Sequence, residues 1–433
     1  MATRVRCAVV VVVAWAGLWW GTKVWGEHVR LHYRITVGAV PLMGGWDHRV
    51  NAALAVSIAF GVFAIIVMPI VALRLPFRYA VATAMVFGAE FAYVINRNDG
   101  RRGLVRGVEE SDSYFAALQH QPDLGHFVRH YVEIVHTGRI AVHVRGHPPG
   151  MVIVLGAMRA LRMGTTKWFA LLIIIGAAVA IGAAAVTLRT VAGVEIARRS
   201  LPFLALSPAA IWIVSSPDAF FAAFVGITMM AMAFAVEGGF APRPSRAWAV
   251  VAGVGLGLCM TLSYGLTLVA VPLAVIAFAY KRVTLLIPVA VAAGVVLVAF
   301  VPFGFWWLDG LRETRHQYLI GMATHRPWWF FIIANIAAFS IAVGPMTWLG
   351  IAWMRQRGHV VFVVAIIGGV IAADVSGMSK AEVERIWLPF AIPLLAAGAA
   401  LWVGRRPLLW VRVALVAQVG VAIAVQTLIN SQW

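Results

Sequence analysis

The sequence predicts an all-α protein that crosses a membrane many times. Of its 433 residues, 62% are hydrophobic and only 12% are charged, and the mean hydropathy is +0.88. Lipid offers the backbone polar groups no partner, so a chain of this kind crosses the bilayer as helices. Apolar runs of spanning length predict about 13 spans. They lie near residues 7–21, 51–73, 80–96, 167–188, 200–215, 219–237, 247–264, 266–280, 284–305, 329–353, 359–374, 386–403 and 408–428.

The composition also argues against a nucleic-acid partner and against cysteine-based sites. The net charge of +18 is explained by short basic loops on the cytoplasmic side, so no nucleic-acid partner is predicted. Cys7 and Cys259 both fall in apolar segments, which argues against a disulfide framework and against a thiolate metal site. The apolar N-terminal segment lacks a small-residue cleavage site, and we expect it to remain as the first helix.

Basic residues in alternate turns predict that the N-terminus lies in the cytoplasm. For the basic turns to alternate in this way, residues 148–164 must stay at the outer surface or re-enter the membrane as a half-helix. The two prolines that open this segment, and Arg159 and Arg162 within it, favour that interpretation. The predicted cytoplasmic residues are Arg4, Arg6, Arg74, Arg78, Arg189, Arg198, Arg199, Arg243, Arg246, Lys281, Arg282, Arg355, Arg357, Arg405 and Arg406.

The outer face of a plasma-membrane protein would then carry most of the polar chemistry. Four polar segments fall on that side, namely 22–50, 96–164, 306–329 and 376–385. Asp218 sits at a fifth outer turn, where it is either a helix N-cap or a second active-site acid.

The loop 96–164 is the one long polar interruption of the chain, and it is rich in acids. Carboxylates at a membrane interface can deprotonate an acceptor hydroxyl as a general base. The alternative is that they are solvated loop acids paired with nearby arginines. The acids are Asp99, Glu109, Glu110 and Asp112.

The same loop is rich in arginines and ends on HVRGHPPG. Arg101, Arg102 and Arg145 could hold an anionic group such as a lipid phosphate, although long loops also escape the positive-inside bias. His143 and His147 are four residues apart, but the glycine and prolines around His147 argue against one regular helix, so no metal site is predicted. We expect His147 to orient a carboxylate or a sugar hydroxyl.

Two further outer segments carry candidate binding residues. In KAEVERIWLPF, Arg385 is placed to clamp a lipid phosphate with a carboxylate holding its guanidinium, unless it merely snorkels to anchor the helix. The same segment contains Lys380, Glu382 and Glu384. In 306–329, Trp306, Trp307, Trp328 and Trp329 are typical of an aromatic belt, while a sugar pocket could be lined by Arg312, Arg315, His316, Tyr318 and Arg326.

No phosphate-binding loop, dinucleotide fingerprint or metalloprotease motif occurs in the sequence, which leaves a nucleotide-sugar donor or ATP-driven transport without support. A lipid-phosphate sugar donor needs no such fold. No cofactor is predicted, and a role for a divalent cation stays open.

With these residues in view, the chain resembles the GT-C superfamily of polyprenyl-phosphate-sugar-dependent glycosyltransferases. EESDSY at 109–114 is similar to the family's acidic pair before a tyrosine, which puts Glu110 at the position of the essential acid. His147, Pro148 and Pro149 match the family's His-Pro-Pro step, and Asp218 falls where many members carry a second outer acid. The resemblance spans roughly 80–390. It implies a GT-C-like catalytic domain at 80–433, with residues 1–79 as a two-helix N-terminal extension and interfacial helices in the loop 96–164.

NDGRRG, HVRGHPPG and EVERIWLPF look like actinobacterial members that build cell-envelope polysaccharides. The resemblance implies an inverting transfer of a pentose, such as methylthioxylose, from decaprenyl phosphate to an envelope glycan of the lipoarabinomannan type. Glu110 or Asp99 would be the base, with Asp112 as a further candidate. Arg385, helped by Arg101, Arg102 or Arg145, would stabilise the leaving phosphate.

Two other classes stay open. A flippase or exporter of a lipid-linked sugar could use the same arginines, but transporters usually carry ionisable groups near the bilayer midplane and often show repeated halves. The third class is a catalytically inactive envelope scaffold.

Overall fold

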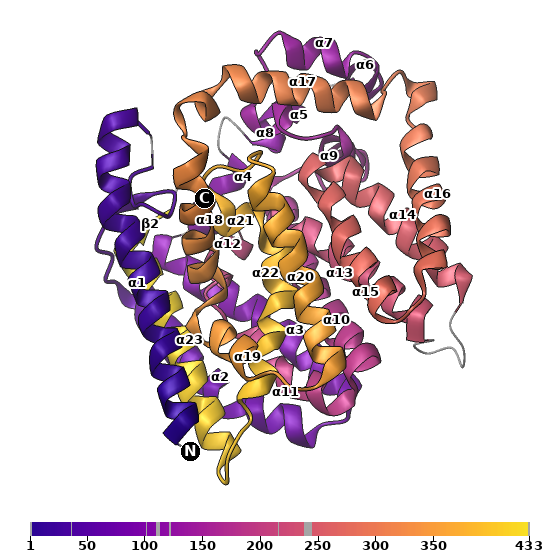
Figure 1. Cartoon of the computed structure of the whole chain (residues 1–433). Coiled ribbons are helices and arrows are strands. Elements are labelled where there is room, and N and C mark those ends of the chain that lie inside the picture. Colours follow the sequence, from indigo (N-terminus) through magenta and orange to yellow (C-terminus); the bar gives the residue numbers. More distant parts are fainter. Residues whose placement is uncertain are drawn as a thin grey trace.

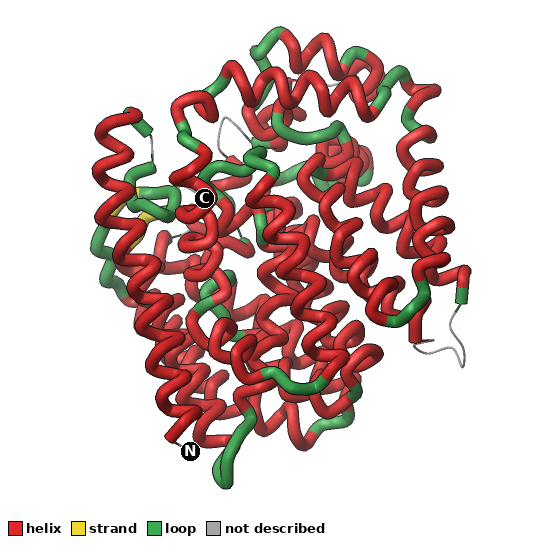
Figure 2. Tube along the Cα trace, viewed as in Figure 1, coloured by secondary structure: helices red, strands yellow, loops and turns green. Residues whose placement is uncertain are grey.

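The computed structural model describes residues 2–35, 37–100, 102–109, 113–120, 123–214, 216–237 and 245–431. Arg243 lies outside these residues. Helices dominate this part of the chain, and the strands β1 (Gly45–Trp46) and β2 (Ile429–Asn430) form one short antiparallel pair (Figure 2). The all-α prediction is confirmed.

Eight helical segments in the described residues are long and apolar enough to cross a membrane. They are α1 (Ala2–Tyr33), α2 (Ala52–Arg74), α3 (Phe77–Asn96), α10 (Thr166–Ala192), α13 (Pro217–Glu237), α16 (Leu286–Val298, extended by 3-10 turns), α20 (Arg357–Val375) and α23 (Pro407–Leu428). These segments indicate a multi-pass membrane protein, and the expected count of 13 spans is not confirmed.

The other apolar runs form shorter or broken helices. The run at 200–215 is divided between α11 (Val194–Ala205) and α12 (Ala210–Ile213). Three more are α14 (Arg246–Leu262), α15 (Ala270–Ala279) after the turn η3 (Tyr264–Val269), and α22 (Leu388–Leu394) continued by η7 (Leu395–Leu401).

The run at 329–353 was expected as one span, but it is bent by 91° between α18 (Trp328–Val343) and α19 (Pro345–Trp353). Gly344 at the break has φ 76°, and Pro345 begins the second helix. Gln418 of α23 bonds both sides of the break. Its Nε2 donates to the Val343 carbonyl at 2.9 Å, and its Oε1 accepts from the Met346 amide at 3.2 Å. The backbone groups freed by the break are thus satisfied inside the protein, as an apolar surrounding requires.

A cap of short helices covers one end of the bundle, and the N-terminus lies near the opposite end (Figure 1). The cap, residues 114–120, 123–160 and 307–320, contains α5 (Tyr114–His120), α6 (Leu124–Arg129), α7 (Tyr131–His136), α8 (Val142–Arg145), α9 (Gly150–Ala160) and α17 (Trp307–Ile320). The flanking short elements are η1 (Arg97–Asp99), η2 (Arg102–Leu104), α4 (Arg106–Glu109), η6 (Met322–His325) and α21 (Val383–Ile386).

Helix α9 belongs to the segment 148–164 that was expected not to cross the membrane. Its 11 residues measure about 16 Å, roughly half of a hydrocarbon core. A side chain at Gly150 would collide with the Thr261 carbonyl at the end of α14, so glycine permits the close approach of α9 to α14 at this point.

The first two helices pack on the rest of the chain. Helix α1 lies along α18 and α19, and α2 packs against α3, α11 and α23. The division of the chain at residue 79 stays a prediction.

Candidate functional site

The candidate site is built around Arg385 of α21, whose side chain is buried in the protein. Its Nη1 donates to Oδ2 of Asp218 at 3.1 Å, and its Nη2 donates to Oε2 of Glu382. Nη2 also lies 3.3 Å from Nε2 of His143. Helices α8, α13 and α21, which are far apart in the sequence, therefore meet at one guanidinium.

Asp218 is fixed by the start of α13. The Ser216 hydroxyl donates to Oδ2 of Asp218 at 2.6 Å and accepts from the Asp218 amide at 3.3 Å. A carboxylate in the first turn is also favoured by the helix dipole. Asp218 is therefore in the first helical turn rather than at the N-cap, and the same carboxylate faces Arg385.

Glu382 reaches Arg385 because the chain turns sharply before α21. Ala381 and Glu382 have φ values of 71° and 63°, in the left-handed region that non-glycine residues seldom adopt. The turn is held by Asn335, whose Oδ1 accepts from the Ala381 amide at 3.1 Å. Glu382 supplies the carboxylate contact that was expected for Arg385.

A further charge of alternating sign lies beyond the ion pair of Arg385 and Glu382. Nη1 of Arg326 lies 3.9 Å from Oε1 of Glu382, and Arg326 is 8% exposed. Arg326, Glu382, Arg385 and Asp218 therefore form an alternating array of two cations and two anions. Such an array can exist at low exposure because each charge has a partner of opposite sign.

The aromatic groups beside the array are neutral. Burial lowers the pKa of His143 well below its usual range, and the Arg385 cation lowers it further. Burial also lowers the pKa of His147, although Asp218 opposes this effect. Since a guanidinium only donates, Nε2 of neutral His143 accepts from Arg385, which assigns the ring proton to Nδ1.

Tyr114 completes the apolar side of the array. Its ring centroid lies 5.6 Å from that of His147 and 5.9 Å from that of His143. Burial raises the pKa of Tyr114 well above its usual range, so it stays protonated. The Tyr114 hydroxyl is buried and has no hydrogen-bond partner among the described residues.

Arg385 itself stays charged. Burial lowers its pKa, but the carboxylates of Glu382 and Asp218 outweigh burial and raise the pKa overall. A fixed buried cation of this kind can bind a phosphate oxygen, and a carboxylate oriented by it can position a hydroxyl.

The predicted acids of the long loop are only partly described. Asp99 is ion-paired with Arg49, and its side chain is 8% exposed. Glu110, Asp112 and Arg101 lie outside the described residues, as does the side chain of Arg102, whose backbone belongs to η2. Glu109 is exposed and accepts from the Thr166 hydroxyl at 3.4 Å.

The other predicted binding residues form separate contacts. Glu384 is fully buried, and its Oε1 accepts from the Met43 amide at 2.8 Å. The Tyr318 hydroxyl donates to the Gly377 carbonyl at 3.0 Å, with Lys380 Nζ 5.8 Å from the tyrosine ring centroid. Arg145 is half-buried, and its carbonyl accepts from the Thr314 hydroxyl at 2.9 Å.

The aromatic belt needs one correction. Trp306, Trp328 and Trp329 are exposed, as a belt requires, but Trp307 is 5% exposed. Its indole N–H donates to the Met260 carbonyl at 2.8 Å, so Trp307 anchors α17 to the end of α14.

Sequence reasoning missed three contributors to the array. His143 was considered only as a metal ligand, Arg326 only as part of a sugar pocket, and Ser216 was not considered. A signal existed for Ser216, because a serine shortly before Pro-Asp at a helix start is typical of side-chain bonding to the first amides.

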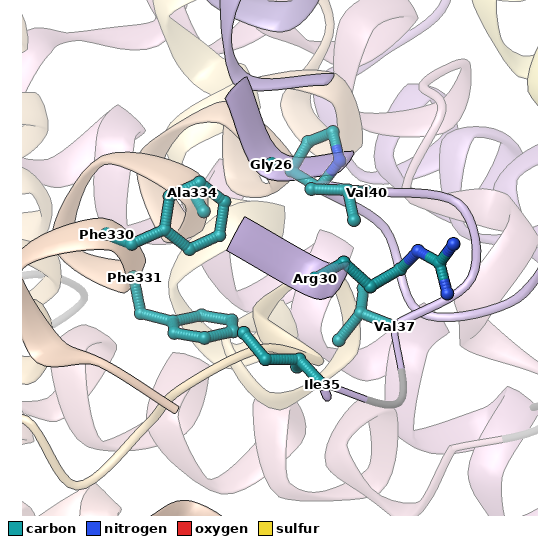
Figure 3. Close-up of a pocket in the computed structure, with 9 residues that line it drawn as sticks. Gly26, Arg30, Ile35, Val37, Val40, Phe330, Phe331 and Ala334 are labelled. Atoms are coloured by element: carbon teal, nitrogen blue, oxygen red, sulfur yellow. The ribbon is translucent and has the colours of Figure 1, made fainter. Parts of the chain in front are cut away.

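A small hollow lies elsewhere, between α1, α18 and the residues Ile35, Val37, Val40 and Pro41 (Figure 3). Its lining is apolar except for Arg30, which is bound to Glu27 at 2.9 Å. The hollow contains none of the residues of the array.

No known protein family, characterised protein or solved structure matches this chain.

Proposed function

We propose that this chain is a membrane glycosyltransferase that moves a sugar from a polyprenyl-phosphate donor to a hydroxyl of a cell-envelope glycan. The observation that carries the proposal is the buried guanidinium of Arg385, held between Asp218 and Glu382 beside His143. The sequence resemblance to GT-C glycosyltransferases supports the reaction class. It also supports a pentose such as methylthioxylose as the sugar, a lipoarabinomannan-type glycan as the acceptor, and the extracytoplasmic face as the place of reaction.

In the proposed reaction the acceptor hydroxyl attacks the anomeric carbon and inverts it. The bond from that carbon to the phosphate oxygen breaks, and the polyprenyl phosphate leaves with the electron pair. Arg385 stabilises the charge that grows on the phosphate. As the phosphate binds Arg385, Glu382 keeps Arg326 as a partner 3.9 Å away, and Asp218 keeps the hydrogen bond from the Ser216 hydroxyl.

The hydroxyl proton passes to an acid of the long loop. Asp99 is ion-paired with Arg49, and Glu110 lies outside the described residues, so both stay candidates for the base. If Glu110→Gln and Asp99→Asn both retain full transfer with normal expression, the base lies elsewhere, with Asp112 and Asp218 the next candidates.

A mass-spectrometric inventory of envelope glycans and polyprenyl-phosphate sugars in a deletion strain tests the function. Loss of one sugar from a glycan, with its lipid-linked donor present on the outer leaflet, is expected. Unchanged glycans and lipids would contradict the proposal. Loss of the glycan sugar with donor confined to the inner leaflet would identify a flippase instead.

The role of Arg385 is tested by kinetics. Arg385→Lys keeps the charge but loses the planar fork, and we expect weaker use of the donor with little change in the KM for the acceptor. Arg199→Lys is the matched control, because Arg199 of α11 is ion-paired with Glu195 outside the array, and it should leave both unchanged. Equal effects of Arg385→Lys on donor and acceptor would contradict a phosphate clamp.

A further inference from the structure

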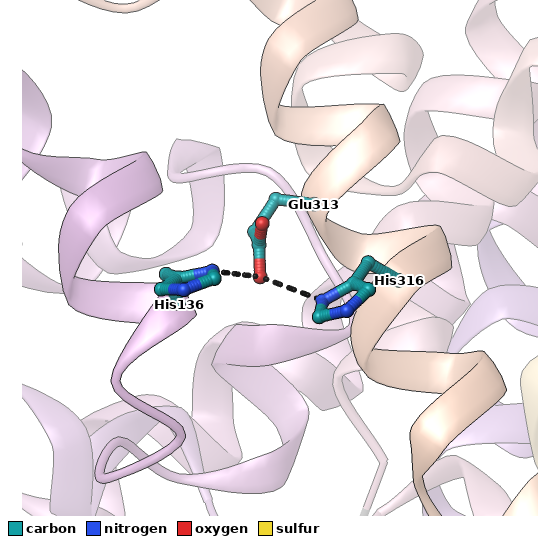
Figure 4. A group of neighbouring side chains, drawn as sticks. All are labelled: His136, Glu313 and His316. Atoms are coloured by element: carbon teal, nitrogen blue, oxygen red, sulfur yellow. Dashed lines mark hydrogen bonds and ion pairs between the residues drawn. The ribbon is translucent and has the colours of Figure 1, made fainter.

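Three side chains that could bind a metal ion meet where α7 packs on α17, outside the Arg385 array (Figure 4). Nδ1 of His136 lies 3.2 Å from Oε1 of Glu313, and Nδ1 of His316 lies 3.5 Å from the same oxygen. All three donor atoms lie within 4.8 Å of one another, and the two imidazole rings face each other with centroids 5.9 Å apart.

The two nitrogen–oxygen separations fit a tetrahedral metal ion. Bonds of about 2.0–2.1 Å to nitrogen and oxygen put neighbouring ligand atoms roughly 3.3–3.4 Å apart. The two contacts to Glu313 are already close to that value. Two imidazoles and one carboxylate are also a ligand set that zinc uses in proteins, with the fourth position left for water.

We propose that His136, Glu313 and His316 form a binding site for a divalent transition-metal ion of the zinc class, which ties α7 to α17. The histidine side chains are 67% and 52% exposed, so the ion can enter from solvent and keep an open position, while Glu313 at 13% is the anchored ligand. This site goes beyond the proposed transferase function and does not depend on it.

The neighbouring contacts hold the ligands in place. Gln317 Nε2 donates to Oε1 of Glu313 at 2.9 Å, which orients the carboxylate as outer-sphere partners do in metal sites. On the α7 side, the Tyr131 hydroxyl donates to the Val144 carbonyl at 3.0 Å. On the α17 side, the Thr314 hydroxyl donates to the Arg145 carbonyl at 2.9 Å. Both helices are thereby fixed to α8.

The test is a zinc titration of the full-length protein, purified in detergent with a tag that lacks histidine and stripped with a chelator. We expect one Zn²⁺ per chain, and we expect His136→Ala, His316→Ala and Glu313→Gln each to weaken binding by about tenfold or more. Zinc should also raise the unfolding temperature of the wild type but not of these three variants.

His126 and His130 provide the matched control. Their rings are 4.3 Å apart on and just after α6, so they could attract zinc without a third ligand. The double variant His126→Ala/His130→Ala should keep the stoichiometric site. Absence of stoichiometric binding, loss of binding only in this double variant, or unchanged binding in the three site variants would overturn the proposal. Because His316 is exposed, His316→Ala stays informative even if Glu313→Gln impairs folding.

Discussion

At Arg385 one guanidinium contacts two carboxylates, and the cost of burying these charges decides how the site responds to mutation. Desolvation of each ion is expensive, and a buried pair is tolerated because its members offset one another. Removing one member is therefore more damaging than removing two members of opposite charge.

We expect Arg385→Gln to lower the free energy of unfolding by about 3–5 kcal/mol, because Asp218 and Glu382 lose their shared partner. Adding Asp218→Asn should recover part of this loss, since an amide needs no counter-ion. Transfer activity should be absent from both variants. Thermal unfolding in detergent and a transfer assay measure the two effects separately. Additive destabilisation in the double variant would show that the two residues are not coupled.

Glu384 provides a pH-dependent prediction. Burial raises its pKa to about 7 from the usual value of 4.5, because ionisation is costly at a fully buried position. Its Oε2 has no hydrogen-bond partner among the described residues. The folded protein then holds a proton that the unfolded chain releases. The stabilising effect of this proton is complete below pH 4.5 and is lost as the pH rises toward 7.

The lost stability amounts to about 3 kcal/mol above pH 7. Glu384→Gln mimics the protonated acid and should be more stable than the wild type at pH 8, but similar to it at pH 4.5. Unfolding temperatures at the two pH values measure this difference. A variant with the same pH dependence as the wild type would exclude Glu384 as the titrating group.

At the scale of elements, the break between α18 and α19 shows what a local pattern omits. Residues 329–353 form an apolar run of spanning length, and Gly344-Pro345 within it is a recognised helix-breaking signal. Hydropathy favoured one span. The bend is completed by Gln418, some seventy residues later in the chain, which no local pattern indicates.

We expect Gly344→Ala to destabilise the protein by about 2 kcal/mol or more, because alanine is strained at φ 76° and its Cβ would collide with Gln418. Gly294→Ala in α16 is the matched control, since a Cβ there meets nothing within 4 Å. Thermal unfolding of the two variants measures the difference. Equal stability of both would contradict the account of the break.

At the scale of the whole molecule, the cap lies at one end of the bundle. The basic turns, which join α2 to α3, α19 to α20 and η7 to α23, lie at the opposite end, as the charge pattern predicts if the N-terminus is cytoplasmic. Composition was sufficient to predict an all-α membrane protein. That 148–164 does not cross the membrane stays a prediction, with which the 11-residue length of α9 agrees. Arg385, Asp218 and His147 were each identified as candidates. The arrangement around Arg385 was not predictable, because its partners Asp218 and His143 lie 167 and 242 residues away along the chain.

The orientation can be measured by cysteine labelling. With Cys7 and Cys259 replaced by alanine, we expect Arg312→Cys on α17 to react with an impermeant maleimide in intact cells. Arg405→Cys should react only after lysis, because Arg405 lies in an exposed loop that is predicted to face the cytoplasm. Labelling of Arg405→Cys but not Arg312→Cys in intact cells would reverse the orientation.

The central claim is transfer of a lipid-linked sugar at the Arg385 array, and reconstitution tests it most directly. Lipid extract from the deletion strain supplies the accumulated donor, the sugar-deficient glycan of the same strain supplies the acceptor, and mass spectrometry follows both. We expect purified wild-type protein to add one sugar to the glycan and release polyprenyl phosphate, and Arg385→Gln to do neither. No transfer by the folded wild-type protein, or equal transfer by the folded Arg385→Gln variant, would contradict the account.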